Sequence, residues 1–173
     1  MNLNRSLCRI LAFTALLVLI GCAGYQLGPT NGTKAGERSV SVNPFINQTM
    51  EPRLTDAVTQ QLRKQLQRDG TFRLSSSGVS DVVVSGTITH YDRLELSFSS
   101  TNILTVVDYR LRITALVKAT NRSSGKLLLD QPVTGTTLLR VGNDLASSER
   151  QALPLLADDL AKNVTALLAD GTW

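Results

Sequence analysis

Few side chains in this sequence could carry out chemistry on a substrate. His90 is the single imidazole, and nothing in the sequence nominates a nucleophile for it to activate. Asp158 and Asp159 are the one adjacent pair of acids, but neighbours on a helix point about 100° apart, so they do not form a carboxylate dyad. One His and two Cys are also too few for a zinc cluster. The sequence therefore predicts no catalytic centre, no metal site and no cofactor.

Cys22 is the residue for which the sequence predicts a defined chemical modification. Residues 10–20 form an apolar run that follows Arg5 and Arg9, and no acid occurs before Cys22. This arrangement is typical of a signal peptide and is too short to span a membrane comfortably. The run leads into Leu19-Ile20-Gly21-Cys22, which resembles a bacterial lipobox. We therefore expect a lipoprotein-type signal peptide over 1–21, cleavage between Gly21 and Cys22, and acyl chains such as palmitate on Cys22.

Two alternatives to lipidation remain open from the sequence, an uncleaved anchor and an ordinary secreted protein. If Cys22 is acylated, several chains hold the protein stably on a membrane, because one acyl chain alone binds only marginally. Ala23 follows the cysteine where an aspartate would favour the inner membrane. By analogy with enteric lipoprotein sorting, this favours the periplasmic side of the outer membrane.

The composition limits the classes of partner. The chain has 173 residues, of which 42% are hydrophobic and 18% charged, so it is long and apolar enough for one folded domain. Aromatic residues make up only 5%, too few for a platform that stacks nucleic-acid bases. Without Arg5 and Arg9, 16 basic residues face 14 acidic ones, so the charge also gives little reason to expect nucleic acid.

The hydrophobic pattern predicts an α+β domain. Residues 22–37 are rich in Gly, Pro, Asn and Thr and are expected to form a flexible tether after the lipid, although an irregular first strand over 26–37 is an alternative. A single domain is expected over 38–173, with two amphipathic helices on one face of a mixed, largely antiparallel sheet. The expected helices are 51–68, with Thr49 as N-cap, and 148–169, which Pro154 either starts or kinks. Strands are expected near 39–43, 72–75, 82–98, 105–120 and 127–141, the number of middle strands being uncertain by one.

The two long middle segments differ in how regular they are. Residues 107–120 alternate, with apolar side chains at odd positions and polar ones at even positions apart from Leu116. Residues 82–98 keep an even apolar phase that includes Leu94, Leu96 and Phe98, but His90 and Asp92 interrupt it. We expect one bent strand, or two strands with a bulge near 90–93.

One face of the predicted sheet is polar, with Thr and Ser residues and the basic pair Arg110 and Arg112. These two arginines are two residues apart, so both side chains leave the same face of a strand. The face is either simply solvated or a contact surface for a polar or anionic partner, since Arg donates forked hydrogen bonds to phosphate and carboxylate groups.

Several motifs, in this order, resemble the lipopolysaccharide-assembly lipoprotein family LptE. They are Cys22-Ala-Gly-Tyr-Gln-Leu27, Val42-Asn-Pro-Phe-Ile-Asn-Gln-Thr49, Glu51-Pro52-Arg53-Leu54, Ser80-Asp-Val-Val-Val-Ser-Gly-Thr-Ile88 and Asp108-Tyr-Arg-Leu111. The resemblance implies an α+β fold with two helices and a four-stranded sheet. It also implies a non-enzymatic, outer-membrane lipoprotein that plugs and helps assemble a large β-barrel translocon of the LptD type, and that assists lipopolysaccharide insertion into the outer leaflet. A different class stays open, a lipoprotein regulator of a periplasmic cell-wall synthase or of a secretion pore.

The resemblance also suggests where the partner is contacted. Some family members have basic residues at loop tips, but the turns 97–105 and 141–149 of this chain have no Lys and no Arg. Direct contact with lipopolysaccharide or the barrel is therefore expected elsewhere, at basic residues of the long strands and their connecting turn. The candidates are Arg110, Arg112, Lys118, Arg122 and Lys126.

Overall fold

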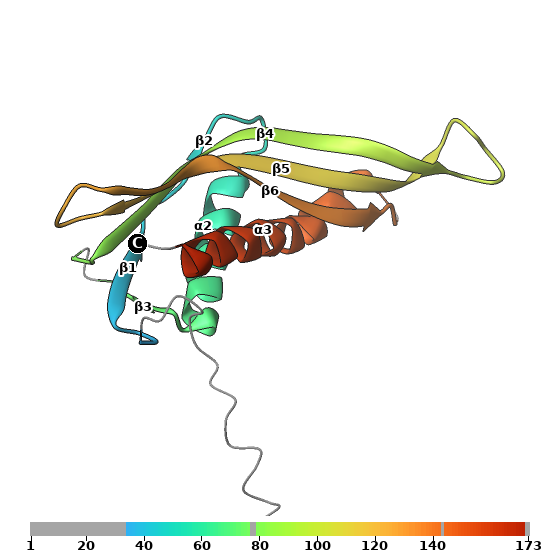
Figure 1. Ribbon diagram of the computed structural model, residues 1–173. Helices are drawn as coiled ribbons and strands as arrows, with labels where there is room; N and C mark the ends of the chain where they lie inside the picture. Colours follow the sequence, from blue (N-terminus) through green and yellow to red (C-terminus); the bar gives the residue numbers. More distant parts are fainter. Residues whose placement is uncertain (1–33, 77–78, 143, 172–173) are drawn as a thin grey trace, which may run out of the picture.

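The computed structural model describes residues 34–76, 79–142 and 144–171 (Figure 1). The expected signal peptide, the cleavage site at Gly21 and Cys22, and most of the expected tether lie outside these residues. The described elements are β1 (Arg38–Val42), β2 (Ile46–Asn47), α2 (Leu54–Asp69), β3 (Phe72–Leu74), β4 (Val82–Phe98), β5 (Val106–Asn121), β6 (Leu127–Arg140) and α3 (Leu145–Asp170).

The strands form one mixed sheet, and both described helices lie on the same side of it (Figure 1). The strand order is β3-β1-β4-β5-β6, and β2 also pairs with β4. Strands β4, β5 and β6 are antiparallel neighbours, whereas β1 pairs in parallel with β3 and β4, and β2 in parallel with β4. The expected α+β class is confirmed, but four strands was wrong, because the sheet has six. Strand β3 lies within the expected segment 72–75, whereas the two-residue strand β2 was not expected and is too short to show a period in the sequence.

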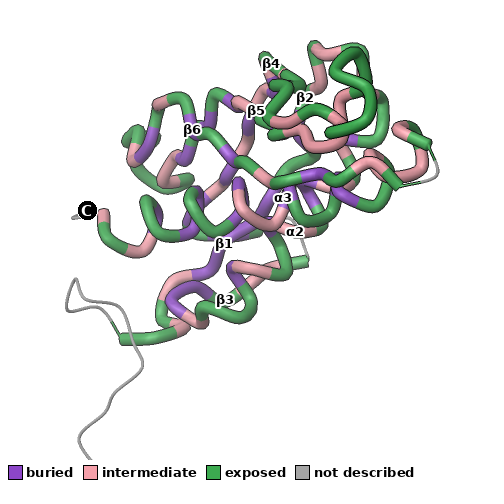
Figure 2. Tube along the Cα trace, turned by 90° about the vertical axis from the view of Figure 1, so that its right-hand side faces the viewer, coloured by how far each residue is buried: buried purple, intermediate pink, exposed green. Residues whose placement is uncertain are grey.

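The core lies between the sheet and the helices. The odd positions of β5 from Leu111 to Ala119 are fully buried, as the alternation predicts, and the even positions point away from the helices. Buried and exposed positions alternate along the strands in Figure 2. Helix α2 contributes Leu54, Val58, Leu62 and Leu66, and α3 contributes an equivalent stripe that includes Leu156 and Leu160.

Strand β4 is continuous, with a bulge earlier than expected. Ile88 lies opposite Ala115 and His90 opposite Thr114, so Thr89 is the extra residue. One extra residue exchanges the two faces of the strand, and Tyr91 therefore points toward the helices opposite Ile113. The even apolar phase therefore does not mark one buried face: Leu94, Leu96 and Phe98 are all exposed, and further register shifts follow between Glu95 and Phe98.

The helix boundaries also differ from the prediction. Helix α2 begins at Leu54, and its N-cap is Arg53, whose side chain makes no capping hydrogen bond, so Thr49 is not the cap. Helix α3 begins at Leu145, capped by the Asp144 carboxylate, which accepts from the backbone N–H of Ser147 at 2.7 Å. Pro154 lies inside α3, well after its start.

Side-chain hydrogen bonds join β1 to the residues that precede β4. The Asp81 carboxylate accepts from the backbone N–H of Ser39 at 2.8 Å and from its hydroxyl at 2.7 Å. These hydrogen bonds favour the charged form and lower the pKa of Asp81. Next to them, the buried hydroxyls of Ser41 and Ser80 lie 2.7 Å apart and share a hydrogen bond. The pairing of the two parallel strands is thus supported by side chains as well as by the backbone.

Two buried threonines allow a matched pair of substitutions with opposite expected effects. Thr165 Oγ1 in α3 is buried without a hydrogen-bond partner in the described part of the chain. Thr59 Oγ1 in α2 accepts from the backbone N–H of Phe45 at 3.2 Å. Thr165→Val should raise the free energy of unfolding by about 1 kcal/mol, because valine has nearly the same shape and removes the unpaired hydroxyl. Thr59→Val should lower it by about 1–3 kcal/mol, because it leaves a buried N–H unpaired. Chemical denaturation of both variants checks this, and equal shifts of the same sign would contradict it.

Candidate interaction surface

The face of β4, β5 and β6 that points away from the helices is made mostly of hydroxyl and charged side chains, and we call it the outer sheet face. The strand register aligns its side chains in rows across the three strands. The rows are Ser85-Lys118-Asp130, Thr87-Leu116-Pro132, His90-Thr114-Thr134, Asp92-Arg112-Thr136, Leu94-Arg110-Leu138 and Ser97-Asp108-Arg140. Neither described helix packs on this face (Figure 1).

Arg110 and Arg112 lie in the half of this face that is nearer to the β4–β5 turn, and both are exposed. Together with Thr136, Thr137 and Leu138 they line a shallow pocket of about 380 Å³. Neither guanidinium forms an ion pair with any described residue. The pair can therefore donate forked hydrogen bonds to a phosphate or carboxylate of a partner without first breaking an internal salt bridge.

The remaining predicted contact residues lie elsewhere or are already paired. Lys118 forms an ion pair with Asp130 at 3.6 Å. Arg122 and Lys126 lie at the β5–β6 turn and are exposed. Lys118 lies eight positions after Arg110, which corresponds to about 26 Å along a strand. The structure therefore brings Arg110 and Arg112 together but separates them from the other three candidates.

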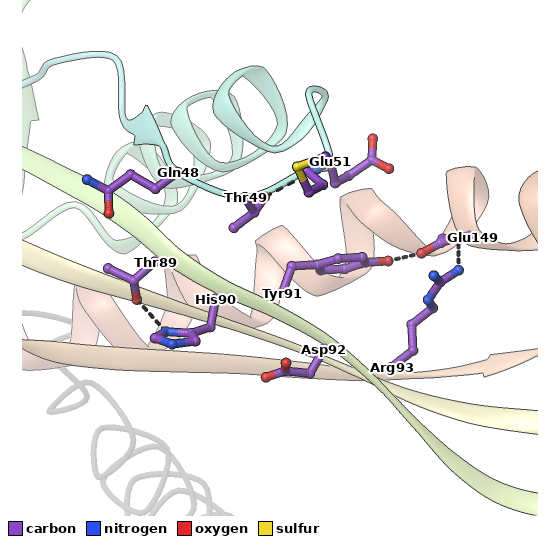
Figure 3. Close-up of a pocket in the computed structure, with 10 residues that line it drawn as sticks. Gln48, Thr49, Glu51, Thr89, His90, Tyr91, Asp92, Arg93 and Glu149 are labelled. Carbon is purple, nitrogen blue, oxygen red and sulfur yellow. Dashed lines mark hydrogen bonds and ion pairs between the residues drawn. The ribbon is translucent and has the colours of Figure 1, made fainter.

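A second polar site lies on the opposite side of β4, where the bulge turns Tyr91 toward α3 (Figure 3). The Tyr91 hydroxyl donates to the Glu149 carboxylate, and Arg93 Nη1 lies 3.2 Å from the other oxygen of Glu149. These side chains line an open pocket of about 430 Å³. The other lining residues are Gln48, Thr49, Met50, Glu51, Thr89, His90 and Asp92.

The loop after β2 forms the other wall of this pocket, and Asn47 holds it in shape. Asn47 Oδ1 accepts from the backbone N–H of Thr49 at 2.9 Å, and its Nδ2 donates to the carbonyl of Glu51 at 2.7 Å. The Thr49 hydroxyl donates to the same Oδ1 and accepts from the Glu51 N–H at 3.3 Å. Asn47 and Thr49 of the motif Val42–Thr49 thus stabilise the conformation of the loop that precedes α2.

The sequence did not reveal the contact of Tyr91 with Glu149, because the two residues are 58 positions apart. His90 and Asp92 interrupt the apolar phase of the sequence, and this indicated a bulge. It did not indicate that the bulge turns Tyr91 toward the helices. Burial raises the pKa of the Tyr91 hydroxyl well above its ordinary value of 10.0, and the hydrogen bond to Glu149 raises it further. Tyr91 is therefore a neutral donor that joins β4 to the first turns of α3.

Tyr91→Phe should lower the free energy of unfolding by about 1 kcal/mol at pH 7, because a half-buried hydrogen bond to a charged group is lost. A raised pKa in the folded state means that this contribution is fully present below pH 10 and is lost as the pH rises further. The stability difference between wild type and variant should therefore shrink above pH 10. Urea denaturation from pH 7 to pH 11 measures it, with Tyr109→Phe as the control for loss of a phenol. A difference that stays constant over this range would contradict the assignment.

Two kinds of site are absent from residues 34–76, 79–142 and 144–171. They contain no group of three His, Cys, Asp or Glu side chains that could hold a metal ion. Among the same residues, no helix is both long and apolar enough to cross a membrane. The described residues form a one-sided α+β layer, with a polar sheet face that no described helix covers.

Comparison with known proteins identifies the family. The model of the lipopolysaccharide-assembly family LptE matches residues 37–168, so this chain belongs to that family of lipopolysaccharide-assembly lipoproteins. A search of curated proteins finds no match.

Solved structures share the fold at low sequence identity. A hypothetical protein of Chlamydia trachomatis is 12% identical, with a TM-score of 0.53 over 78% of this chain and 96% of that one. A protein of Xanthomonas campestris is 10% identical, with a TM-score of 0.51 over 82% and 93%. A candidate lipoprotein of Caulobacter crescentus is 10% identical, with a TM-score of 0.50 over 72% and 87%. At such identities the likeness establishes the fold alone.

Proposed function

We propose that this protein is a lipid-anchored, non-enzymatic plug of an outer-membrane β-barrel, and that it helps the barrel assemble and insert lipopolysaccharide into the outer leaflet. Family membership gives the process, lipopolysaccharide assembly. The observation that supports the plug role is the outer sheet face, which is polar, rich in hydroxyls and not covered by a described helix. The lumen of such a barrel is polar, so threonine and serine side chains suit contact with its wall.

Arg110 and Arg112 are the residues of this face that we assign to the anionic partner. Arg110 lies in its row between the exposed apolar side chains Leu94 and Leu138, whereas Arg112 lies between Asp92 and Thr136. An arginine between leucines fits a group that has phosphate next to hydrocarbon, as lipopolysaccharide does, and it equally fits a carboxylate on the barrel wall. Lys118, Arg122 and Lys126 are the corresponding candidates at the other end of the sheet.

The partner that co-purifies with the protein tests this function directly. Tagged full-length protein is purified from detergent-solubilised outer membranes, and the proteins that accompany it are identified by mass spectrometry. A large β-barrel protein in roughly equal amount is the expected result. A cell-wall synthase or a secretion pore in its place would overturn the proposal and favour the regulator function.

Cys22→Ala should move the protein from the membrane fraction to the soluble periplasmic fraction while its folded domain stays intact. The physical reason is that the acyl chains on Cys22 are the proposed source of stable membrane binding, and alanine cannot be acylated there. Cell fractionation with immunoblotting measures the change, and circular dichroism of the soluble variant checks that it is folded. Unchanged membrane association of a folded variant whose mass shows that residues 1–21 have been removed would contradict the lipidation of Cys22.

A further inference from the structure

Helix α3 runs along the outer edge of β6, and one row of its side chains faces that edge (Figure 1). The row repeats every four residues, as neighbours on one helix face do, and it consists of Gln151, Leu155, Asp159 and Asn163. The Asp159 carboxylate accepts from the backbone N–H of Thr136 at 2.7 Å. One turn further on, Asn163 Nδ2 donates to the carbonyl of Thr134 at 2.8 Å. The C-terminal half of the row therefore satisfies backbone groups of the strand edge.

The next two edge positions of β6 are left open. Val141 N–H donates to the carbonyl of Val107 at 2.8 Å, so the odd positions of β6 bond to β5 and the even positions point to the edge. Leu138 and Arg140 therefore direct their backbone N–H and C=O groups outward. These backbone groups have no hydrogen-bond partner within the described part of the chain. The residue of the helix row that follows Asp159 toward the N-terminus of α3 is Leu155, whose side chain cannot supply one.

The open stretch of edge forms one wall of a groove of about 690 Å³, and α3 forms the other wall with Gln151, Ala152 and Leu155. Leu155 is 61% exposed on the helix side of the edge, and Leu138 is 67% exposed on the outer sheet face. Side chains alternate between the two faces of a strand, so a strand added here would place side chains against both leucines. Unpaired backbone groups between two exposed leucines are complementary to an extended peptide with apolar side chains.

We propose that an extended segment of the barrel protein pairs with Leu138 and Arg140 as an additional edge strand, an inference that rests on the proposed function for its partner. The row Leu94-Arg110-Leu138 of the outer sheet face ends at this edge, so the added strand continues the surface assigned to the barrel. Strands of a closed barrel wall already pair on both sides, so the segment belongs to a loop or a terminus of the partner. A second copy of this chain fits poorly, because α3 also lines its β6 edge and the two helices would meet in the same groove.

Amide hydrogen exchange, read residue by residue by mass spectrometry, tests the pairing in the full-length protein alone and in its purified complex with the barrel. Bonding to a partner strand should slow exchange of the Leu138 and Arg140 amides at least about tenfold. The Thr136 amide, which Asp159 already binds, should change little. A barrel that co-purifies without slowing the two open amides would overturn the pairing and leave the proposed function standing, whereas absence of any barrel would overturn both. Protection in the protein alone that grows with its concentration would assign the edge to a second copy and so overturn the pairing with the barrel.

Two substitutions at one position separate backbone pairing from side-chain contact. Leu138→Pro removes the outward N–H and puts a ring in the path of an added strand, whereas Leu138→Ala removes the same side chain but keeps the N–H. An edge position whose N–H faces outward tolerates proline, as Pro132 of the same strand shows, so both variants should stay folded, which a thermal melt checks. We expect Leu138→Pro to reduce recovery of the barrel about tenfold more than Leu138→Ala does. Equal recovery with the two folded variants would overturn the proposal.

Discussion

Gly135→Val is expected to lower the free energy of unfolding by about 3 kcal/mol or more, a large part of the stability of an ordinary domain. A Cβ atom at Gly135 would lie 2.6 Å from the backbone nitrogen of Leu160 and 2.8 Å from its Cα. Backbone atoms of a helix cannot move aside as the end of a flexible side chain can. The whole of α3 would therefore have to shift away from β6.

The same shift would break the contacts by which α3 covers the edge of the sheet. The Asp159 carboxylate accepts from the backbone N–H of Thr136 at 2.7 Å, and Asn163 Nδ2 donates to the carbonyl of Thr134 at 2.8 Å. Pro132 on the same strand has no N–H to offer. These groups block the middle of the exposed edge of β6 against pairing with another chain. Gly135→Val should thus promote aggregation as well as unfolding.

Gly142→Val is the matched control, because a Cβ there meets only Ser148 Oγ at the ordinary distance of 3.6 Å. Denaturant unfolding gives the free energies, and light scattering on heating reports aggregation. A Gly135→Val protein that unfolds at the denaturant concentration of the wild type would show that α3 does not depend on this close approach.

The extent to which the sequence predicts this fold depends on how long each pattern persists. Strand β5 shows a clear alternation in its sequence, so its buried odd positions from Leu111 to Ala119 were identified residue by residue. Helix α2 shows its apolar stripe at intervals of four, and the stripe is buried as predicted. The part of β4 after Thr89 could not be placed from its apolar phase, because the bulged residue Thr89 exchanges the faces and two further register shifts follow between Glu95 and Phe98.

The predicted contact residues illustrate a second limit, since a sequence gives the face of a strand but not the distances along it or the ion pairs. Arg110 and Arg112 share a face because of their spacing, and the structure places them together. Lys118 has the same phase, yet its ion pair with Asp130 depends on the register of β6, which no local pattern fixes. The bridge from Tyr91 to Glu149 requires both the bulge and the docking of α3, so it arises only in the folded chain.

The largest functional effect is expected from reversing the charge of the arginine pair. Arg110→Glu with Arg112→Glu should reduce the amount of barrel that co-purifies at least about tenfold, because two forked donors become carboxylates that repel phosphate and carboxylate groups. Both side chains are exposed and have no ion pair in the described structure, so the variant protein itself should lose no more than about 1 kcal/mol of stability, through repulsion between the new carboxylate at position 112 and Asp92 opposite it. A folded variant with normal recovery of the barrel would exclude this part of the outer sheet face from the contact.

A matched control distinguishes a local contact from a general effect of net charge. Arg53→Glu with Lys64→Glu makes the same change of charge on the exposed side of α2, the helix layer on the other side of the sheet. Normal recovery with this control and loss with the arginine pair would locate the contact on the outer sheet face. Equal loss with both would mean that long-range attraction, which salt screens over about 10 Å at 0.1 M, dominates the association. Repeating the purification at higher salt then separates the two cases, because a forked hydrogen bond in a desolvated contact is screened much less than a distant charge.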